Sequence, residues 1–234
     1  MKKSSLILAI LVGVLSVGVV AYADTLWNTP TVEGNPVPED HWSGYNVQSG
    51  SGINATQGWA NLNTTLSWDI DYVESTGLYR YLYTWSTIPD PVPGGLSHII
   101  IELTPGTTIL RGLEERYDIE YPSPDKGVWD DSDGNPLLPF GFYGAKISNI
   151  ATADEKVYKF FFYSPEEPVW GNFYAKDGGG NGEGAVVAWN MGLGSAQGVF
   201  IARPDRLDKQ VPEPGTLFLL GAGLLGLVAV RRRK

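Results

Sequence analysis

The sequence contains no cysteine and only two histidines, His41 and His98. Disulfide bonds, thiolate nucleophiles and cysteine metal sites are therefore excluded, and the fold must be stabilised by packing. Neither histidine lies in a recognised catalytic motif, and the Gly-x-Ser-x-Gly pattern typical of one hydrolase class is missing. A Ser-His-Asp triad assembled in space stays open, because its members need not be close in sequence. For His98, which shares its side of an expected strand with Ile100, we expect a structural or surface role.

Basic residues are scarce between the two ends of the chain. Residues 24–210 hold 11 Lys and Arg against 25 Asp and Glu, a formal charge of −14. This charge repels phosphate backbones, so nucleic-acid binding is not expected. The Gly-rich segment 178–184 also lacks the Lys and the Ser or Thr of a P-loop, and it predicts a flexible loop.

Helical periodicity is nearly absent, whereas 29 Gly and 16 Pro supply turns and 8 Trp, 12 Tyr and 8 Phe supply large apolar contacts. Residues 62–72 and 78–85 alternate between apolar and polar side chains, and together they predict a hairpin. In the second run, Tyr79, Tyr81 and Tyr83 form a one-face stripe that could be core or a binding surface. Further strands are expected at residues 97–103, 140–150, 156–163, 169–175, 185–191 and 198–202. The pattern predicts an all-β fold, an antiparallel β-sandwich or jelly roll, in one domain over residues 24–202.

The N-terminal segment has the three parts of a secretory signal peptide. Lys2 and Lys3 precede an apolar run over residues 6–20, and a small-x-small site ends at Ala23. We expect a signal peptide over residues 1–23, export across the inner membrane and cleavage after Ala23.

The C-terminal segment, residues 211–234, predicts a short membrane helix with a processing site before it. Pro212, Glu213 and Pro214 resist helix formation and keep the backbone extended. The apolar residues 217–230 would span roughly 21 Å as a helix, less than the roughly 30 Å hydrocarbon core, so we expect transient anchoring. The basic tail should stay cytoplasmic; it consists of Arg231, Arg232, Arg233 and Lys234. Residues 203–210 are expected to form a linker.

These C-terminal features resemble the PEP-CTERM sorting signal of Gram-negative bacteria. The resemblance rests on Pro212-Glu213-Pro214, the Gly- and Leu-rich helix and the terminal Arg cluster, and it covers only residues 211–234. It implies that an exosortase-type membrane enzyme processes the chain and that the product reaches the cell surface or the extracellular matrix. It also implies an exopolysaccharide or biofilm context.

The middle domain offers few residues for chemistry. Asp130, Asp131 and Asp133 surround Gly134 and could hold calcium, the one cofactor that the sequence suggests. The helix-loop-helix calcium pattern is not met, and a solvated Asp-rich turn is the alternative. Paired carboxylates such as Asp69 with Asp71, or Glu114 with Glu115, could serve glycoside hydrolysis. Trp42, Trp59 and Trp129, together with Trp27, lie in or beside loop-like segments and could stack against sugars; otherwise they cap the core.

We therefore expect a non-enzymatic surface or matrix protein with a structural or adhesive role. A carbohydrate-binding β-sandwich module and a secreted polysaccharide hydrolase are the alternatives. The expected partners are exosortase, transiently the inner membrane, and an extracellular polysaccharide.

Overall fold

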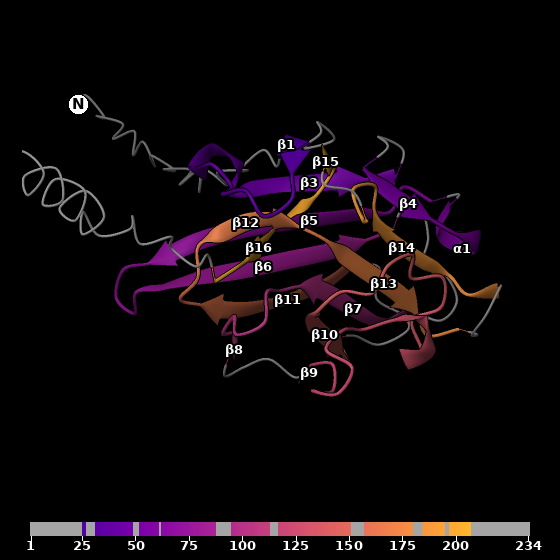
Figure 1. The fold of residues 1–234 in the computed structure, drawn as a ribbon. Helices are drawn as coiled ribbons and strands as arrows, with labels where there is room; N and C mark the ends of the chain where they lie inside the picture. The colour runs from indigo at the N-terminus through magenta and orange to yellow at the C-terminus, as the bar shows by residue number, and fades with distance from the viewer. Residues whose placement is uncertain are drawn as a thin grey trace, which may run out of the picture.

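The computed structural model of the chain describes residues 25–26, 31–48, 52–60, 62–87, 95–112, 117–150, 157–179, 184–194 and 197–206. β-Strands dominate this part of the chain, as Figure 1 shows. The expected signal peptide, sorting motif and membrane helix lie outside the described residues, as do Trp27, Glu114 and Glu115. The described residues form two six-stranded sheets and two short strand pairs.

The first sheet is built on the predicted hairpin. Its strand order is β1-β3-β5-β6-β11-β8, and its neighbours are antiparallel except for the parallel pair β1 and β3. The alternation that predicted the hairpin recurs as burial, because Leu66, Trp68 and Ile70 of β5 point into the core. The strands are β1 (Thr25–Leu26), β3 (Ser43–Val47), β5 (Thr65–Val73), β6 (Leu78–Ser86), β11 (Val157–Ser164) and β8 (Leu110–Arg111).

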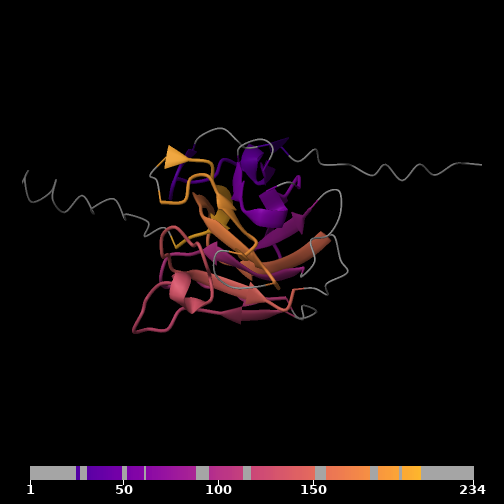
Figure 2. The same ribbon diagram turned by 90° about the vertical axis from the view of Figure 1, so that its right-hand side faces the viewer.

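The second sheet is antiparallel throughout and packs against the inner face of the first. Its strand order is β4-β14-β13-β7-β10-β9. Figure 2, turned by 90°, shows how its strands lie against the first sheet. The strands are β4 (Ile53–Ala55), β14 (Val187–Asn190), β13 (Phe173–Asp177), β7 (Leu96–Glu102), β10 (Gly144–Ser148) and β9 (Asp118–Glu120).

Shorter elements complete the sandwich. Strand β12 (Pro168–Gly171) pairs with β16 (Ile201–Pro204), and β2 (Thr31–Val32) pairs with β15 (Gln197–Gly198). The segment after β2 adds to β12 through hydrogen bonds such as Gly34 N–H to the Trp170 carbonyl, 2.8 Å. The helical elements are η1 (Glu39–His41), α1 (Gln57–Ala60) and η3 (Asp131–Asp133).

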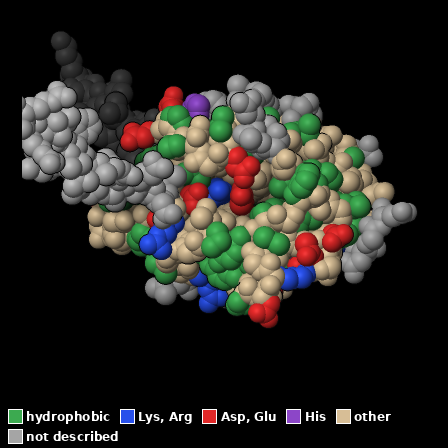
Figure 3. Space-filling view, viewed as in Figure 1, with side chains coloured by type: hydrophobic (Ala, Val, Ile, Leu, Met, Phe, Trp, Pro, Cys, Tyr) green, Lys and Arg blue, Asp and Glu red, His purple; other side chains and the backbone are tan. Residues whose placement is uncertain are grey.

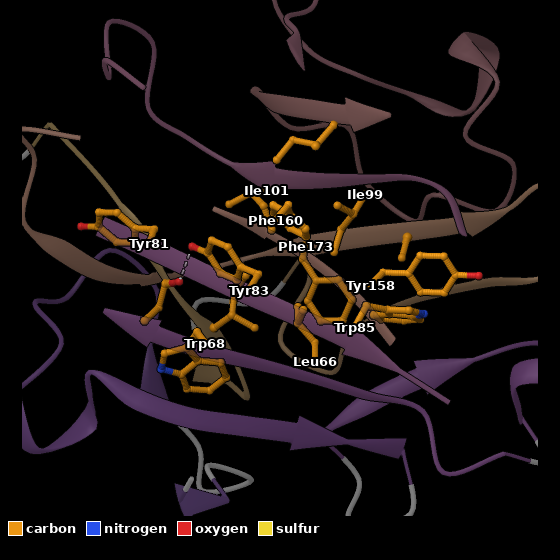
Figure 4. Packing of buried hydrophobic residues seen from close by; sticks show 14 of the residues in the cluster. Leu66, Trp68, Tyr81, Tyr83, Trp85, Ile99, Ile101, Tyr158, Phe160 and Phe173 are labelled. Carbon is orange, nitrogen blue, oxygen red and sulfur yellow. Dashed lines mark hydrogen bonds between the residues drawn. The ribbon is translucent and has the colours of Figure 1, made fainter. Parts of the chain in front are cut away.

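The core between the sheets is rich in aromatic rings. Tyr83 stacks on Phe160 with ring centroids 5.3 Å apart, and Trp85 lies 4.9 Å from Trp59. The Tyr83 hydroxyl donates to the Ala202 carbonyl at 2.8 Å, so the polar tip of this buried ring is satisfied. Figure 4 shows core side chains of both sheets pointing toward one another, among them Tyr83 and Phe160 of the first sheet and Phe173 of the second. The stripe Tyr81, Tyr83 and Trp85 is therefore core.

The second sheet is covered on both faces, which explains its nearly continuous burial. A second cluster, including Ile100, Trp129, Phe142 and Tyr174, packs on the face away from the first sheet. The segment that carries Trp129 and Phe142 thus covers this face of the second sheet. Strand β13 is buried at all five of its residues for this reason.

Several boundaries differ from those expected, and two of them differ because of contacts made by Glu102. The strand expected over residues 169–175 is split at Asn172, whose backbone and side-chain N–H groups both donate to Glu102 Oε2, at 2.7 and 2.9 Å. The expected linker at 203–210 begins too early, because β16 extends to Pro204 and the side chains of Arg203 and Asp205 are buried. Residues 203–205 belong to the fold.

Candidate functional site

One candidate site is a largely buried ionic cluster made of Glu33, Glu102, Arg203 and Asp205. Arg203 is 3% exposed, and its Nε lies 3.4 Å from Glu102 Oε2. Its Nη1 lies 3.3 Å from Asp205 Oδ2. Figure 3 shows acidic and basic side chains adjoining in the middle of one face, in the region where Figure 1 places β12 and β16.

Strand β12 leaves room for this cluster at Gly171. A Cβ atom at that position would lie 1.9 Å from Arg203 Nε and 2.4 Å from Arg203 Cδ. Glycine is therefore required for the guanidinium side chain to lie across the strand. The cluster joins the segment after β2, the end of β7 and the last described strand, β16.

Glu33 and Glu102 form a carboxyl pair within the cluster. The pKa of Glu33 is raised to about 7, first by burial and then by the charge of Glu102 and a hydrogen bond between the two side chains. The charge of Arg203 and a hydrogen bond from Asn172 act in the opposite direction. Below pH 7 the pair therefore holds a proton on Glu33, which removes one of three negative charges facing a single arginine.

We expect Glu33→Gln to weaken the dependence of stability on pH between about 5 and 8. The unfolded carboxyl has a pKa of about 4.3 and is ionised in this range, whereas the folded one keeps its proton up to about 7. Stability should thus fall as pH rises through 7 in the wild type.

The amide in Glu33→Gln should remove this loss, raising the melting temperature at pH 8 by about 2–4 °C relative to the wild type. Thermal unfolding of both proteins at pH 5 and pH 8 measures the difference. Equal changes in melting temperature between pH 5 and pH 8 in the two proteins would contradict a proton held on Glu33 in the folded state.

The Asp-rich turn is closed by its own side chains and by a lysine. Lys126 Nζ lies 3.1 Å from Asp130 Oδ1 and 2.7 Å from Asp133 Oδ1. Hydrogen bonds from Ser132, and then Lys126, lower the pKa of Asp130 to about 2. Asp130 and Asp133 also form a capping box on η3, while Asp131 is exposed.

These contacts correspond to the solvated turn that was the alternative to calcium. Within the described ranges, no group of three or more His, Asp or Glu side chains is arranged to hold a metal ion.

Among the groups considered for catalysis, His98 and Asp69 are bonded within the fold. His98 is 5% exposed, and its Nε2 lies 3.0 Å from Asn135 Oδ1. Burial, and then the charges of Lys146 and Lys176, lower its pKa to about 3, so the ring is neutral. Asp69 Oδ1 accepts from Ser43 Oγ at 2.5 Å.

Asp71 belongs to an exposed ion pair on the outer face of the hairpin. Its Oδ2 lies 2.5 Å from Arg80 Nη2.

Of the tryptophans considered for sugar stacking that the structure describes, two are buried. Trp59 is 2% exposed and packs on Trp85, and Trp129 is 9% exposed with its Nε1–H donating to the Gly144 carbonyl at 2.9 Å. This burial argues against sugar stacking by either ring. Trp42 is half-buried at the edge of the core, with its Nε1–H donating to the Val37 carbonyl at 3.2 Å.

Trp42 joins two tyrosines in what we call the end patch, made of Trp42, Tyr72 and Tyr79. Trp42 and Tyr79 meet edge to face, with ring centroids 5.6 Å apart, and Tyr72 lies 4.9 Å from Tyr79. Tyr72 is 48% exposed. The aromatic stripe of β6 thus passes from the core to the surface at Tyr79.

A separate open cavity of about 360 Å³ lies beside the edge strands β8 and β9. Its described lining consists of Ile109, Arg111, Asp118, Ile119 and Tyr121. Tyr121 stacks on Tyr143 with ring centroids 6.3 Å apart. This cavity is a second location where a ring is exposed beside polar groups.

Sequence reasoning missed the ionic cluster. Glu33, Glu102 and Arg203 are far apart in the chain, and no local pattern marks them. The end patch could have been found in part, because Tyr72 and Tyr79 continue the two alternating faces of the predicted hairpin.

Comparison with known proteins gives a match at the C-terminus. Residues 210–234 match the family described as PEP-CTERM protein-sorting motif. The match indicates an exported protein that is sorted transiently at the membrane of a Gram-negative bacterium and processed by exosortase. Neither the curated proteins nor the solved structures gave a match to this chain. Among the helices of the described ranges, none has the length and apolar character needed to cross a membrane.

Proposed function

We propose that the chain is a non-enzymatic protein of the cell surface or extracellular matrix, with a structural or adhesive role in an exopolysaccharide or biofilm context. The sorting motif supports delivery to the outside of the inner membrane. The described residues form a two-sheet sandwich with an aromatic core, a scaffold suited to presenting a surface.

The observation that carries the proposal is that His98 and several carboxylates of the described residues are engaged within the fold. His98 is buried and neutral, and Asp71 is paired with Arg80. Glu33 and Glu102 are hydrogen-bonded to each other, whereas glycosidases hold their two carboxyl groups roughly 5 to 9.5 Å apart around the scissile bond. This contact supports a stabilising role for the pair.

We expect the mature chain to lose the residues beyond the region 212–216 only in cells with an active exosortase. Intact-mass measurement of the exported protein, with and without the enzyme, tests this processing. The matched control replaces Pro212, Glu213 and Pro214 by alanine and should keep the tail. The same mass in both strains would contradict processing by exosortase.

The surface role is tested by location and by activity. We expect the mature protein in the matrix fraction of a biofilm, with no release of reducing sugar ends from the exopolysaccharide of the producing strain. Depolymerisation that is lost in Glu33→Gln or Glu102→Gln would establish the hydrolase alternative and overturn the proposal.

A carbohydrate-binding module is the second candidate, and the exposure of the end patch favours it. Binding of a glycan without cleavage would also explain adhesion.

A further inference from the structure

At its turn, the hairpin β5–β6 extends past the second sheet, as Figure 1 shows. Tyr72 and Tyr79 are direct cross-strand partners near the hairpin turn. They lie on the face that carries Ile70 and Tyr81 in the core, since side chains alternate along each strand. Trp42, the residue that follows η1, meets Tyr79 edge to face. An aromatic surface thus continues the core into solvent.

Exposed acidic residues lie beside the end patch. Glu39 and Asp40 begin η1, and the backbone N–H of Trp42 donates to the Glu39 carbonyl at 3.2 Å. Burial, then the charge of Glu167, the neighbouring Tyr72 and the charge of Glu39 raise the pKa of Tyr79. Arg80 is the one basic residue of the hairpin, and it lies on the opposite face in its ion pair with Asp71. Residues 24–210 carry a formal charge of −14 as a whole.

Exposed aromatic rings beside carboxylates should bind some extracellular glycans more tightly than others. The apolar C–H face of a sugar packs on exposed aromatic rings whatever its charge. A uronate-rich polymer would be repelled by the carboxylates, and a neutral polymer would gain nothing from their charge. A sugar with a protonated amino group can contact the rings and be attracted by Glu39 and Glu167 at once.

We propose that the end patch binds a polysaccharide whose sugars carry protonated amino groups. The inference rests on the proposed matrix role and names the partner for it. Trp42 and Tyr72 would contact the sugar faces, and the carboxylates would attract the ammonium groups.

The test is titration calorimetry of the mature exported protein at pH 6 with three oligosaccharides of similar length. The probes are a glucosamine hexamer, an N-acetylglucosamine hexamer and an oligouronate. We expect the glucosamine hexamer to bind at least tenfold more tightly than either of the others. Equal binding of the acetylated hexamer, or no binding of the glucosamine hexamer, would overturn the proposal.

Four variants locate the site. Trp42→Ala and Tyr72→Ala are expected to weaken binding about tenfold, and Glu39→Gln is expected to weaken it less and to reduce its salt dependence. The matched control is Tyr121→Ala, which removes another exposed tyrosine that stacks on a tyrosine, beside the cavity at β8 and β9. Melting curves should show that each variant is folded.

The possible results distinguish a failure of the proposed glycan partner from a failure of the proposed matrix role. Equal binding by all four variants would mean general attraction of a cation to an acidic protein, and loss in Tyr121→Ala alone would assign the site to the cavity; either result overturns the proposal. If the protein is in the matrix fraction and the glucosamine hexamer does not bind, the proposed function stands while this inference fails.

Discussion

Replacing Arg203 by methionine is expected to lower the free energy of unfolding by about 3–5 kcal/mol. The side chain is almost completely buried, and its guanidinium group compensates Glu102 and Asp205. Methionine fills a similar volume but leaves these carboxylates buried without a cation. Denaturant unfolding of the mature protein at pH 7, followed by tryptophan fluorescence, measures the loss.

The matched control is Arg80→Met, which breaks an ion pair of the same type at the surface. Both partners there are exposed, at 37% and 52%, so water replaces the lost contact. We expect a change of at most about 1 kcal/mol. Adding Glu102→Gln to Arg203→Met should recover part of the loss, because it removes a buried charge. Equal effects of the two arginine variants would contradict a buried cluster.

The sequence predicted the sandwich well where burial follows a simple period. Strands β5 and β6 alternate because one face meets the second sheet and the other meets water. The register of the hairpin pairs Trp68 with Tyr83 and Leu66 with Trp85, as expected for two runs joined by a short turn. Local pattern was sufficient because the partner strand is adjacent in the chain.

Local pattern failed where distant residues determine the structure. Residues 203–205 have the composition of a linker, yet Arg203 is held by Glu102, about a hundred residues earlier. The break between β12 and β13 likewise depends on Glu102, which accepts both N–H groups offered by Asn172. Neither contact leaves a mark in the surrounding sequence.

The Asp-rich turn is an intermediate case. The composition around Gly134 predicted a turn, and Gly134 adopts a φ of 78°, the left-handed conformation that glycine favours. The partner of its carboxylates, Lys126, is close in sequence but did not stand out from the pattern. The sequence therefore predicted the turn but not the ion pairs between its carboxylates and Lys126.

Trp59→Ala is expected to lower the free energy of unfolding by about 3–5 kcal/mol, whereas Trp42→Ala should cost on the order of 1 kcal/mol. The two rings looked alike in the sequence, each beside a loop. Trp59 lies on the short helix α1, 2% exposed and 4.9 Å from Trp85, so alanine would leave a large cavity in the core. Trp42 is only half-buried, and water can fill the space it leaves.

Glycan binding should show the opposite order for the same pair of variants. The folded fraction of Trp59→Ala keeps the end patch and should bind the glucosamine hexamer like the wild type, while Trp42→Ala should lose about tenfold in affinity. Denaturant unfolding and calorimetry at a temperature where both variants are folded give the two measurements. Weaker glycan binding by folded Trp59→Ala, or a loss of stability in Trp42→Ala as large as the roughly 3–5 kcal/mol expected for Trp59→Ala, would contradict this division between core and surface.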